Sequence, residues 1–204
     1  MTAKSTREHL IDVGLRLMHQ NGYNATGLTD ILKAADVPKG SFYHHFRSKE
    51  DFAAVVLERY GLRERERSTA ILNNTSISPL KRLRRYFTEL LKVYGQKSPI
   101  PGCLMGRFSL EVATESQPLR KRINSSFENW QRSIAAVIQQ AVAQKELPAD
   151  TDAESLAGFL LNSWEGALLR SQAEKSNAPL ETFMSYVFDT LLTKDSQHKT
   201  KASR

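Results

Sequence analysis

The sequence of 204 residues predicts an all-α protein of about nine helices. Three observations carry this prediction. Apolar residues recur with a period near 3.6 along almost the whole chain, and no stretch shows the strict alternation expected of a β-strand. The prolines fall between the periodic segments, at positions 38, 79, 99, 101, 118, 148 and 179. Because proline disrupts the interior of a helix, these positions indicate where elements end.

Three short helices are expected first. Residues 6–20 form an apolar face from Leu10, Val13, Gly14 and Leu17. Asn21-Gly22 follows as a stop signal. Residues 28–35 carry apolar side chains at the i, i+3, i+4 and i+7 positions of a second helix. The segment "ADVP" then leads into a third helix at residues 39–46, and this short connection is typical of a helix-turn-helix.

Longer helices follow. A fourth helix is expected from Ser48 to about residue 73, because "SKED" resembles a capping box with Asp51 in place of the usual glutamate. Five more are expected at residues 79–95, 104–114, 118–146, 151–173 and 179–193. The last residues, 194–204, lack an apolar anchor and are expected to be disordered.

Bulk composition excludes several classes of protein. The first 15 residues contain charges where a secretory signal would be apolar. No charge-free run exceeds 13 residues, whereas a membrane span needs about 20 apolar residues. The single cysteine excludes an intrachain disulfide framework and a cysteine-based zinc cluster. We therefore expect a cytoplasmic protein with no membrane span and no metal site.

The net charge of +7 permits an anionic partner such as nucleic acid. The distribution of this charge gives little further support for nucleic-acid binding, because the first 65 residues hold 10 Lys and Arg against 8 Asp and Glu, a net charge of only +2. The case for nucleic-acid binding therefore depends on where particular residues lie.

The third predicted helix has two different sides. Phe42 and Phe46 share one side and are expected to pack against the first two helices. The remaining side is small or hydrogen-bonding, and consists of Lys39, Gly40, Ser41, Tyr43 and His44. A recognition helix in a DNA major groove needs this combination of close approach and polar side chains. Lys49, at the start of the next helix, can neutralise a phosphate. The alternative is that Tyr43 and His44 are ordinary surface residues.

The segment "GYNATGLTDILKAADVPKGSFYHHFRSKEDF" closely resembles the DNA-binding segment of the TetR/AcrR family of bacterial transcription regulators. The resemblance implies that DNA is contacted by Lys39, Gly40, Ser41, Tyr43, His44 and Lys49. The family often has Ser or Thr capping the second helix, where this chain has Gly27. Thr26 and Thr29 are therefore kept as further phosphate-contact candidates. The resemblance also implies a helix-turn-helix domain at residues 1–47, with the fourth helix connecting it to a regulatory and dimerisation domain at 48–193.

The last two predicted helices carry wide apolar stripes, which indicate a homodimer. The residues that we assign to this interface are Leu156, Phe159, Leu160, Trp164, Leu168, Phe183, Val187 and Leu191. In the resembled family these helices pair with their copies as a four-helix bundle. The alternative is that both stripes complete the core of a single chain.

Cys103 is a candidate sensor. It lies at the predicted start of a helix, and Arg107 follows at i+4; a helix amino terminus and a nearby cation both favour the reactive thiolate. The "PGCL" placement resembles a subgroup that includes the repressor of N-ethylmaleimide reductase, whose matching cysteine responds to electrophiles. Phe108, Trp130 and Trp164 complete a candidate ligand pocket. A structural or pocket cysteine is the alternative reading, and core or dimer roles are alternatives for both tryptophans.

The sequence favours a DNA-binding regulator, most simply a homodimeric repressor released from a palindromic operator by a small molecule or by modification of Cys103. A cysteine enzyme would need a base, but the histidines lie only in the amino-terminal domain or the tail, at positions 9, 19, 44, 45 and 198. No enzymatic activity and no cofactor are therefore expected. A non-specific architectural DNA-binding protein is the remaining alternative. Repression, as opposed to activation, follows only from the habit of the family.

Overall fold

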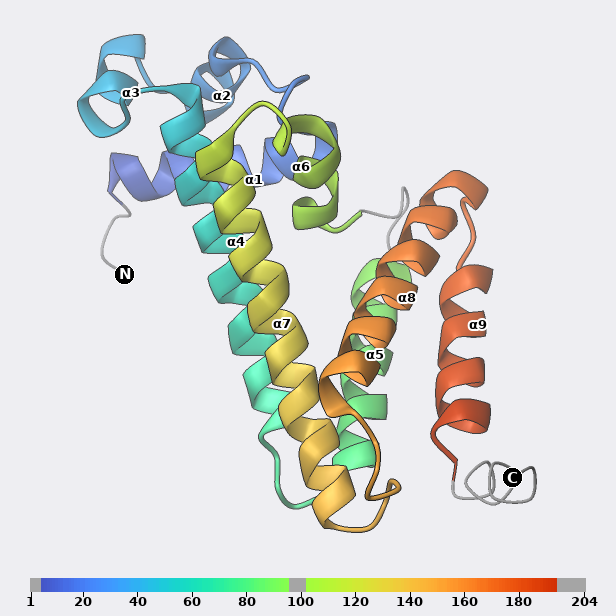
Figure 1. Ribbon diagram of the computed structural model, residues 1–204. Coiled ribbons are helices and arrows are strands. Elements are labelled where there is room, and N and C mark those ends of the chain that lie inside the picture. The colour runs from blue at the N-terminus through green and yellow to red at the C-terminus, as the bar shows by residue number, and fades with distance from the viewer. Residues whose placement is uncertain (1–4, 96–101, 194–204) are drawn as a thin grey trace. The chain divides into compact units, whose positions relative to one another are not determined.

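The computed structural model describes residues 5–95 and 102–193, and all of its regular elements are helical, as predicted (Figure 1). Pro99, Pro101 and the predicted tail at residues 194–204 lie outside the described residues. The helices are α1 (Thr6–Asn21), α2 (Leu28–Ala35), α3 (Lys39–His45), α4 (Lys49–Leu72), α5 (Pro79–Gly95), α6 (Leu104–Val112), α7 (Gln117–Ala143), α8 (Ala153–Glu174) and α9 (Ala178–Tyr186).

The helix ends follow from local capping chemistry. The Ser5 hydroxyl accepts a hydrogen bond from the backbone N–H of Glu8 and caps α1. Gly22 ends α1 with φ of 87°, a conformation that glycine adopts without strain. At α4, the Ser48 hydroxyl accepts from the N–H of Asp51, as the predicted capping box requires. The Asp51 carboxylate, however, accepts from the N–H of Arg47 rather than that of Ser48.

The last helix differs from the prediction. Residues 179–193 were expected to form one helix, but α9 ends at Tyr186 and a π-helical turn follows at Val187–Leu191. The apolar period continues through both, so periodicity alone does not reveal the change in hydrogen bonding.

The chain divides into two compact units. The first contains the described residues up to Glu64 together with Cys103–Phe127, and the second contains the rest. The boundary falls within the residues of α4 and α7, each of which is one continuous helix.

In the first unit, α1, α2 and α3 pack against one another. Their core is aromatic where α3 meets the start of α4. The ring centroids of Phe42, Phe46 and Phe52 lie 4.8–5.3 Å apart, and all three side chains are buried. Such ring pairs stabilise a fold beyond the effect of buried area alone.

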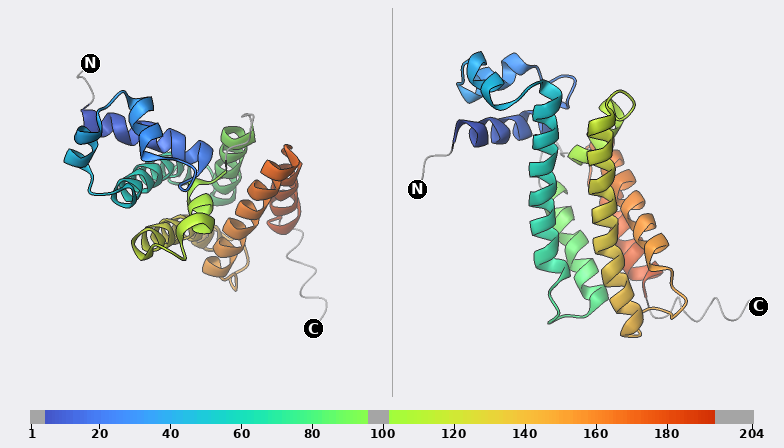
Figure 2. Two further views of the ribbon diagram at one scale, coloured as in Figure 1. Left: turned by 90° about the horizontal axis from the view of Figure 1, so that it is seen from above. Right: turned by 60° about the vertical axis from the view of Figure 1, so that its left-hand side comes forward.

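In the second unit, α8 and α9 lie side by side, as both views in Figure 2 show, and α9 also contacts α5. The centre of its core is formed by Phe87, Trp164 and Phe183, whose ring centroids are 5.0–5.4 Å apart. Among the described residues, no helix combines the length and apolar character that a membrane span requires.

Candidate nucleic-acid interface and cysteine site

The turn between α2 and α3 sets the direction of α3. Asp36 ends α2 in the left-handed conformation, with φ of 52°. The N–H of Val37 then bonds to the carbonyl of Leu32. Pro38 precedes the first residue of α3 in an extended conformation. This tight αL turn is a common way to end a helix, and here it brings α3 back against α1 and α2.

The two sides of α3 separate as the sequence predicted. Phe42 is fully buried and Phe46 nearly so, and the Arg7 guanidinium lies 5.5 Å from the centroid of the Phe46 ring. On the other side, Lys39, Gly40, Tyr43 and His44 are exposed, while Ser41 is half-buried. A side chain added at Gly40 would meet nothing within 4 Å, so this side of α3 is open.

The candidate phosphate contacts do not share one environment. Thr29 is exposed. Thr26 is only 1% exposed, and its hydroxyl donates a 2.6 Å hydrogen bond to the carbonyl of Gly22. Its hydroxyl therefore holds the turn after α1 and is not presented to a ligand, contrary to its selection as a phosphate contact.

Lys49 is half-buried, and its ammonium lies 4.2 Å from the centroid of the Tyr23 ring, within cation–π distance. Burial lowers the pKa of Lys49, while the Glu111 carboxylate opposes this shift. Burial also raises the pKa of the Tyr23 hydroxyl, with Glu50 and Glu115 adding to the rise. The lysine is thus held against the turn after α1 by an aromatic ring.

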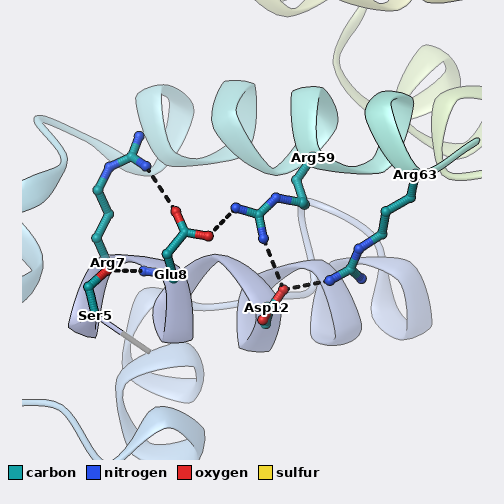
Figure 3. A network of polar contacts seen from close by, with 6 residues as sticks. All are labelled: Ser5, Arg7, Glu8, Asp12, Arg59 and Arg63. Carbon is teal, nitrogen blue, oxygen red and sulfur yellow. Dashed lines mark hydrogen bonds and ion pairs between the residues drawn. The ribbon is translucent and has the colours of Figure 1, made fainter. Parts of the chain in front are cut away.

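Ion pairs attach α1 to α4 (Figure 3). Arg59 lies between Glu8 and Asp12, and its guanidinium bonds to both carboxylates. Arg63, one turn further along α4, bonds to Asp12 at 2.6 Å. The hydrogen bond from Arg59 to Glu8 is the main cause of the raised pKa of Arg59. The network therefore fixes α1, the helix that precedes the helix-turn-helix, against α4.

Cys103 is 6% exposed and is the residue that precedes α6, where it makes no side-chain capping bond. The Tyr60 hydroxyl lies 3.9 Å from Sγ and donates to it. Arg107 has a different partner from the expected one, because its guanidinium donates to the carbonyls of His19 and Gln20. Tyr60 therefore supplies a hydrogen-bond donor to the sulfur, and the cysteine lies at the amino terminus of α6.

The other candidate pocket residues divide between the two units. Phe108 belongs with Cys103, is fully buried, and its ring packs edge-on against Tyr23 at 5.6 Å. Trp164 is fully buried in the core of the second unit, and Trp130 is half-buried there. In the part of the chain that the structure describes, neither indole N–H has a hydrogen-bond partner.

The predicted dimer residues separate into core and surface groups. Five are buried within this chain, namely Leu160, Trp164, Leu168, Phe183 and Val187. Leu156 is half-buried, while Phe159 and Leu191 are 48% and 39% exposed. Leu169 and Tyr186, which the sequence analysis did not select, are 58% and 59% exposed. The wide stripes thus serve mainly the core of the chain, as the alternative reading held.

Three residues that the sequence analysis did not assign contribute to these sites. Tyr60 and Glu111 gave no local signal, because their partners are distant in sequence. Tyr23 lies in the quoted segment that resembles the TetR/AcrR family, so its importance was detectable, although its contact with Lys49 was not. Among the described residues, no group of His, Cys, Asp or Glu side chains could hold a metal ion.

Two family models match this chain. The one described as "Bacterial regulatory proteins, tetR family" covers residues 10–56, and "Tetracyclin repressor-like, C-terminal domain" covers residues 79–187. The chain belongs to the TetR family of bacterial regulatory proteins, which are DNA-binding transcriptional regulators and not enzymes.

Individual relatives agree over nearly the full length. The chain is 34% identical over 192 residues to the HTH-type transcriptional repressor DhaR of Mycobacterium sp. (strain GP1), covering 94% of this chain and 95% of the relative. It is 34% identical over 196 residues to the repressor NemR of Escherichia coli (strain K12), covering 94% and 96%. The crystal structure of reduced E. coli NemR superposes with a TM-score of 0.84 at 32% identity, covering 90% of this chain and 95% of that one.

Proposed function

We propose that this protein is a homodimeric repressor that binds a palindromic operator and leaves it when Cys103 is modified or a small molecule binds. The single observation that carries the DNA-binding part is the exposed polar side of α3, backed by buried Phe42 and Phe46. The names of DhaR and NemR as repressors support repression over activation.

The proposed reading residues are Lys39, Gly40, Ser41, Tyr43 and His44, with Lys49 and Thr29 as phosphate contacts. Lys39 and Tyr43 are the most informative because both are exposed, although the Tyr43 ring also packs edge-on against buried Phe42 at 5.5 Å. We assign operator binding to residues 1–47, and regulation and dimerisation to residues 48–193.

Operator binding is tested by selecting a duplex from random sequences and comparing its affinity with that of random DNA. We expect a ratio of at least about 1,000, maintained as salt rises, because base contacts add to the salt-dependent phosphate term. Lys39→Ala and Tyr43→Ala are expected to weaken operator binding about tenfold. Lys121→Ala, which removes the same charge from an exposed position on α7, serves as the control. A ratio near one would favour an architectural DNA-binding protein.

A homodimer is proposed because one helix-turn-helix binds weakly and two half-sites multiply the affinity. The apolar residues available on the surface of the second unit are Phe159, Leu169, Tyr186 and Leu191. Gly166, also exposed on α8, would let a partner helix approach closely, since nothing lies within 4 Å of a side chain added there.

For the inducing signal, we propose an electrophile that reacts with Cys103. With N-ethylmaleimide the thiolate adds to the carbon–carbon double bond, a C–S bond forms, and the neighbouring carbon takes a proton from water. Cys103 is buried at the start of α6, so we expect an adduct on its sulfur to displace neighbouring side chains. The proposed outcome is a shift of α6 that also alters the position of α4 and so the separation of the two reading helices.

A reversible ligand is the second candidate, and a specific observation favours it. Trp164 and Ser171 on α8 are both fully buried, yet neither the indole N–H nor the Ser171 hydroxyl has a partner among the described residues. Buried polar groups are normally satisfied, so these two are available to a ligand. Trp130 has a similarly unpaired indole N–H.

The two candidates are separated by measuring operator affinity before and after one equivalent of N-ethylmaleimide, with mass spectrometry to confirm modification. If Cys103 is the switch, wild-type protein loses affinity and Cys103→Ser does not. If fully modified wild-type protein binds as tightly as before, the thiol is structural and the ligand candidate is preferred.

A further inference from the structure

The carboxyl-terminal end of α1 is bonded by two side chains of α6. The last carbonyls of any helix lack partners within the helix. Here Arg107 Nη1 donates to the carbonyls of His19 and Gln20, at 3.0 and 2.8 Å. A guanidinium at this end is also favoured by the helix dipole. Arg107 therefore caps α1 from a residue 87 positions away in the sequence.

Glu111, one turn further along α6, bonds to the turn that follows α1. Its Oε2 accepts a 2.8 Å hydrogen bond from the backbone N–H of Asn24. A side-chain carbon at Gly22 would lie only 2.0 Å from Glu111 Oε1, so the carboxylate approaches the turn where only glycine fits. Arg107 Nε lies 3.7 Å from Glu111 Oε1, and the two charges support each other.

The turn held in this way leads directly to the reading helices. It contains Thr26, whose hydroxyl bonds back to the carbonyl of Gly22, and it ends at Gly27, the residue that caps α2. Tyr23, in the same turn, packs between the Phe108 ring of α6 and the Lys49 ammonium of α4. Displacing the turn would therefore move both the start of α2 and a proposed phosphate contact.

We propose that Arg107 and Glu111 are positioning residues for operator recognition, because they hold the turn that sets the direction of α2 and α3. This inference rests on the proposed operator-binding function. Neither side chain needs to touch DNA. The positioning comes from hydrogen bonds between charged side chains and the backbone, which are stronger than neutral ones.

The direction in which Glu111→Gln changes DNA affinity distinguishes a positioning role from a purely electrostatic effect. Removing a negative charge near a DNA-binding surface should strengthen binding to any duplex. If Glu111 positions the turn, Glu111→Gln should weaken operator binding, because it loses the charged acceptor that holds the Asn24 N–H. Glu115→Gln is the matched control, since it removes the same charge nearby and the Glu115 carboxylate is exposed.

The experiment uses the full-length protein and an operator selected with the wild type, with the active fraction of each variant fixed by stoichiometric titration. Glu111→Gln and Arg107→Gln are expected to lose about tenfold in operator affinity. Affinity for a random duplex should depend on net charge alone, so Glu111→Gln should match Glu115→Gln. Arg107→Gln should likewise match Arg120→Gln, which removes the same charge from an exposed arginine of the same unit. Arg107→Lys, which can still donate to a carbonyl, should recover part of the loss.

The positioning role is overturned if Glu111→Gln binds the operator as tightly as Glu115→Gln, or more tightly. It is also overturned if operator and random DNA lose affinity equally in both Gln variants. Failure of the wild type to select any duplex would instead reject the proposed function, and the inference with it. Correcting for the active fraction prevents partial unfolding from imitating the expected result.

Discussion

At Cys103, the sequence predicts the residue's position along the chain but not the side chains that contact it. Helical spacing correctly places the cysteine at the start of α6 and Arg107 four residues later. Spacing along one helix cannot show that the arginine turns to carbonyls of α1, or that Tyr60 donates to the sulfur from α4. The contacts of Arg107 and Tyr60 are tertiary, and no local pattern encodes them. Thr26 was misjudged for a different reason, because its hydroxyl bonds locally to the carbonyl of Gly22, four residues earlier.

Removing the Tyr60 hydroxyl should slow the reaction of Cys103. A donor to sulfur stabilises the thiolate, which is the nucleophile. We expect Tyr60→Phe to react with N-ethylmaleimide about threefold more slowly than wild type at neutral pH, given the length of this hydrogen bond. The phenyl ring keeps the edge-on contact with His19. The rate is measured by mass spectrometry of timed, quenched samples.

Tyr86→Phe is a suitable control, because it also removes a hydroxyl from a buried tyrosine, but one that lies in the second unit, whereas Cys103 lies in the first. Equal rates for wild type and Tyr60→Phe would show that the hydroxyl does not activate the thiol.

At the scale of elements, most helices could be predicted from apolar period and end signals. Proline at Pro38 and Pro79 and glycine at Gly22 mark helix boundaries in the structure as they do in the sequence. The end of α9 could not be predicted, because the π-helical turn keeps the apolar pattern while changing the backbone bonds. The stripes on α8 and α9 predicted burial correctly for five of the eight assigned residues, but periodicity could not show that these five are covered by the same chain.

The amino terminus of α8 should make stability depend on pH. The Asp152 carboxylate accepts hydrogen bonds from the Ser155 hydroxyl and from the N–H groups of Ser155 and Glu154. These bonds, the Ser155 hydroxyl first, lower the pKa of Asp152 below its ordinary value of 3.8. The ionised form therefore stabilises the folded state, fully above about pH 4. This contribution is lost as the pH falls through the lower folded-state value.

Asp152→Asn should consequently lower the thermal midpoint at neutral pH, with a difference from wild type that shrinks as the pH falls below about 4. Differential scanning calorimetry across this range provides the measurement. Asp150→Asn, at an exposed position just before the cap, should leave the pH profile unchanged. A wild-type advantage that persists unchanged in acid would contradict the assigned role of the carboxylate.

At the scale of the whole molecule, the exposed apolar residues of α8 and α9 are what a second copy would cover. Phe159, Gly166 and Leu169 fall within about 80° of one another around α8, on the side away from buried Leu160 and Trp164. An exposed apolar strip of this kind on a helix pair is typical of an interface.

We expect Phe159→Glu to convert the proposed dimer to a monomer, because a charge in the centre of an apolar interface is costly to desolvate. Operator affinity should fall by at least about 100-fold, since the two half-sites are then bound independently. Analytical ultracentrifugation gives the oligomeric state. Leu110→Glu, at an 80% exposed leucine of α6, is the control that should stay dimeric. A dimeric Phe159→Glu protein would place the interface elsewhere.

The separation of α3 into a buried aromatic side and an open polar side affects how this protein can change over generations. Lys39 and His44 are exposed and lie outside the buried Phe42–Phe46 packing, whereas the Tyr43 ring packs edge-on against Phe42 at 5.5 Å. On the proposed reading side, replacements at Lys39 or His44 can therefore change operator preference with little effect on the packing of α3. A gene duplicate could acquire a different set of target promoters in a few steps while retaining the same signal.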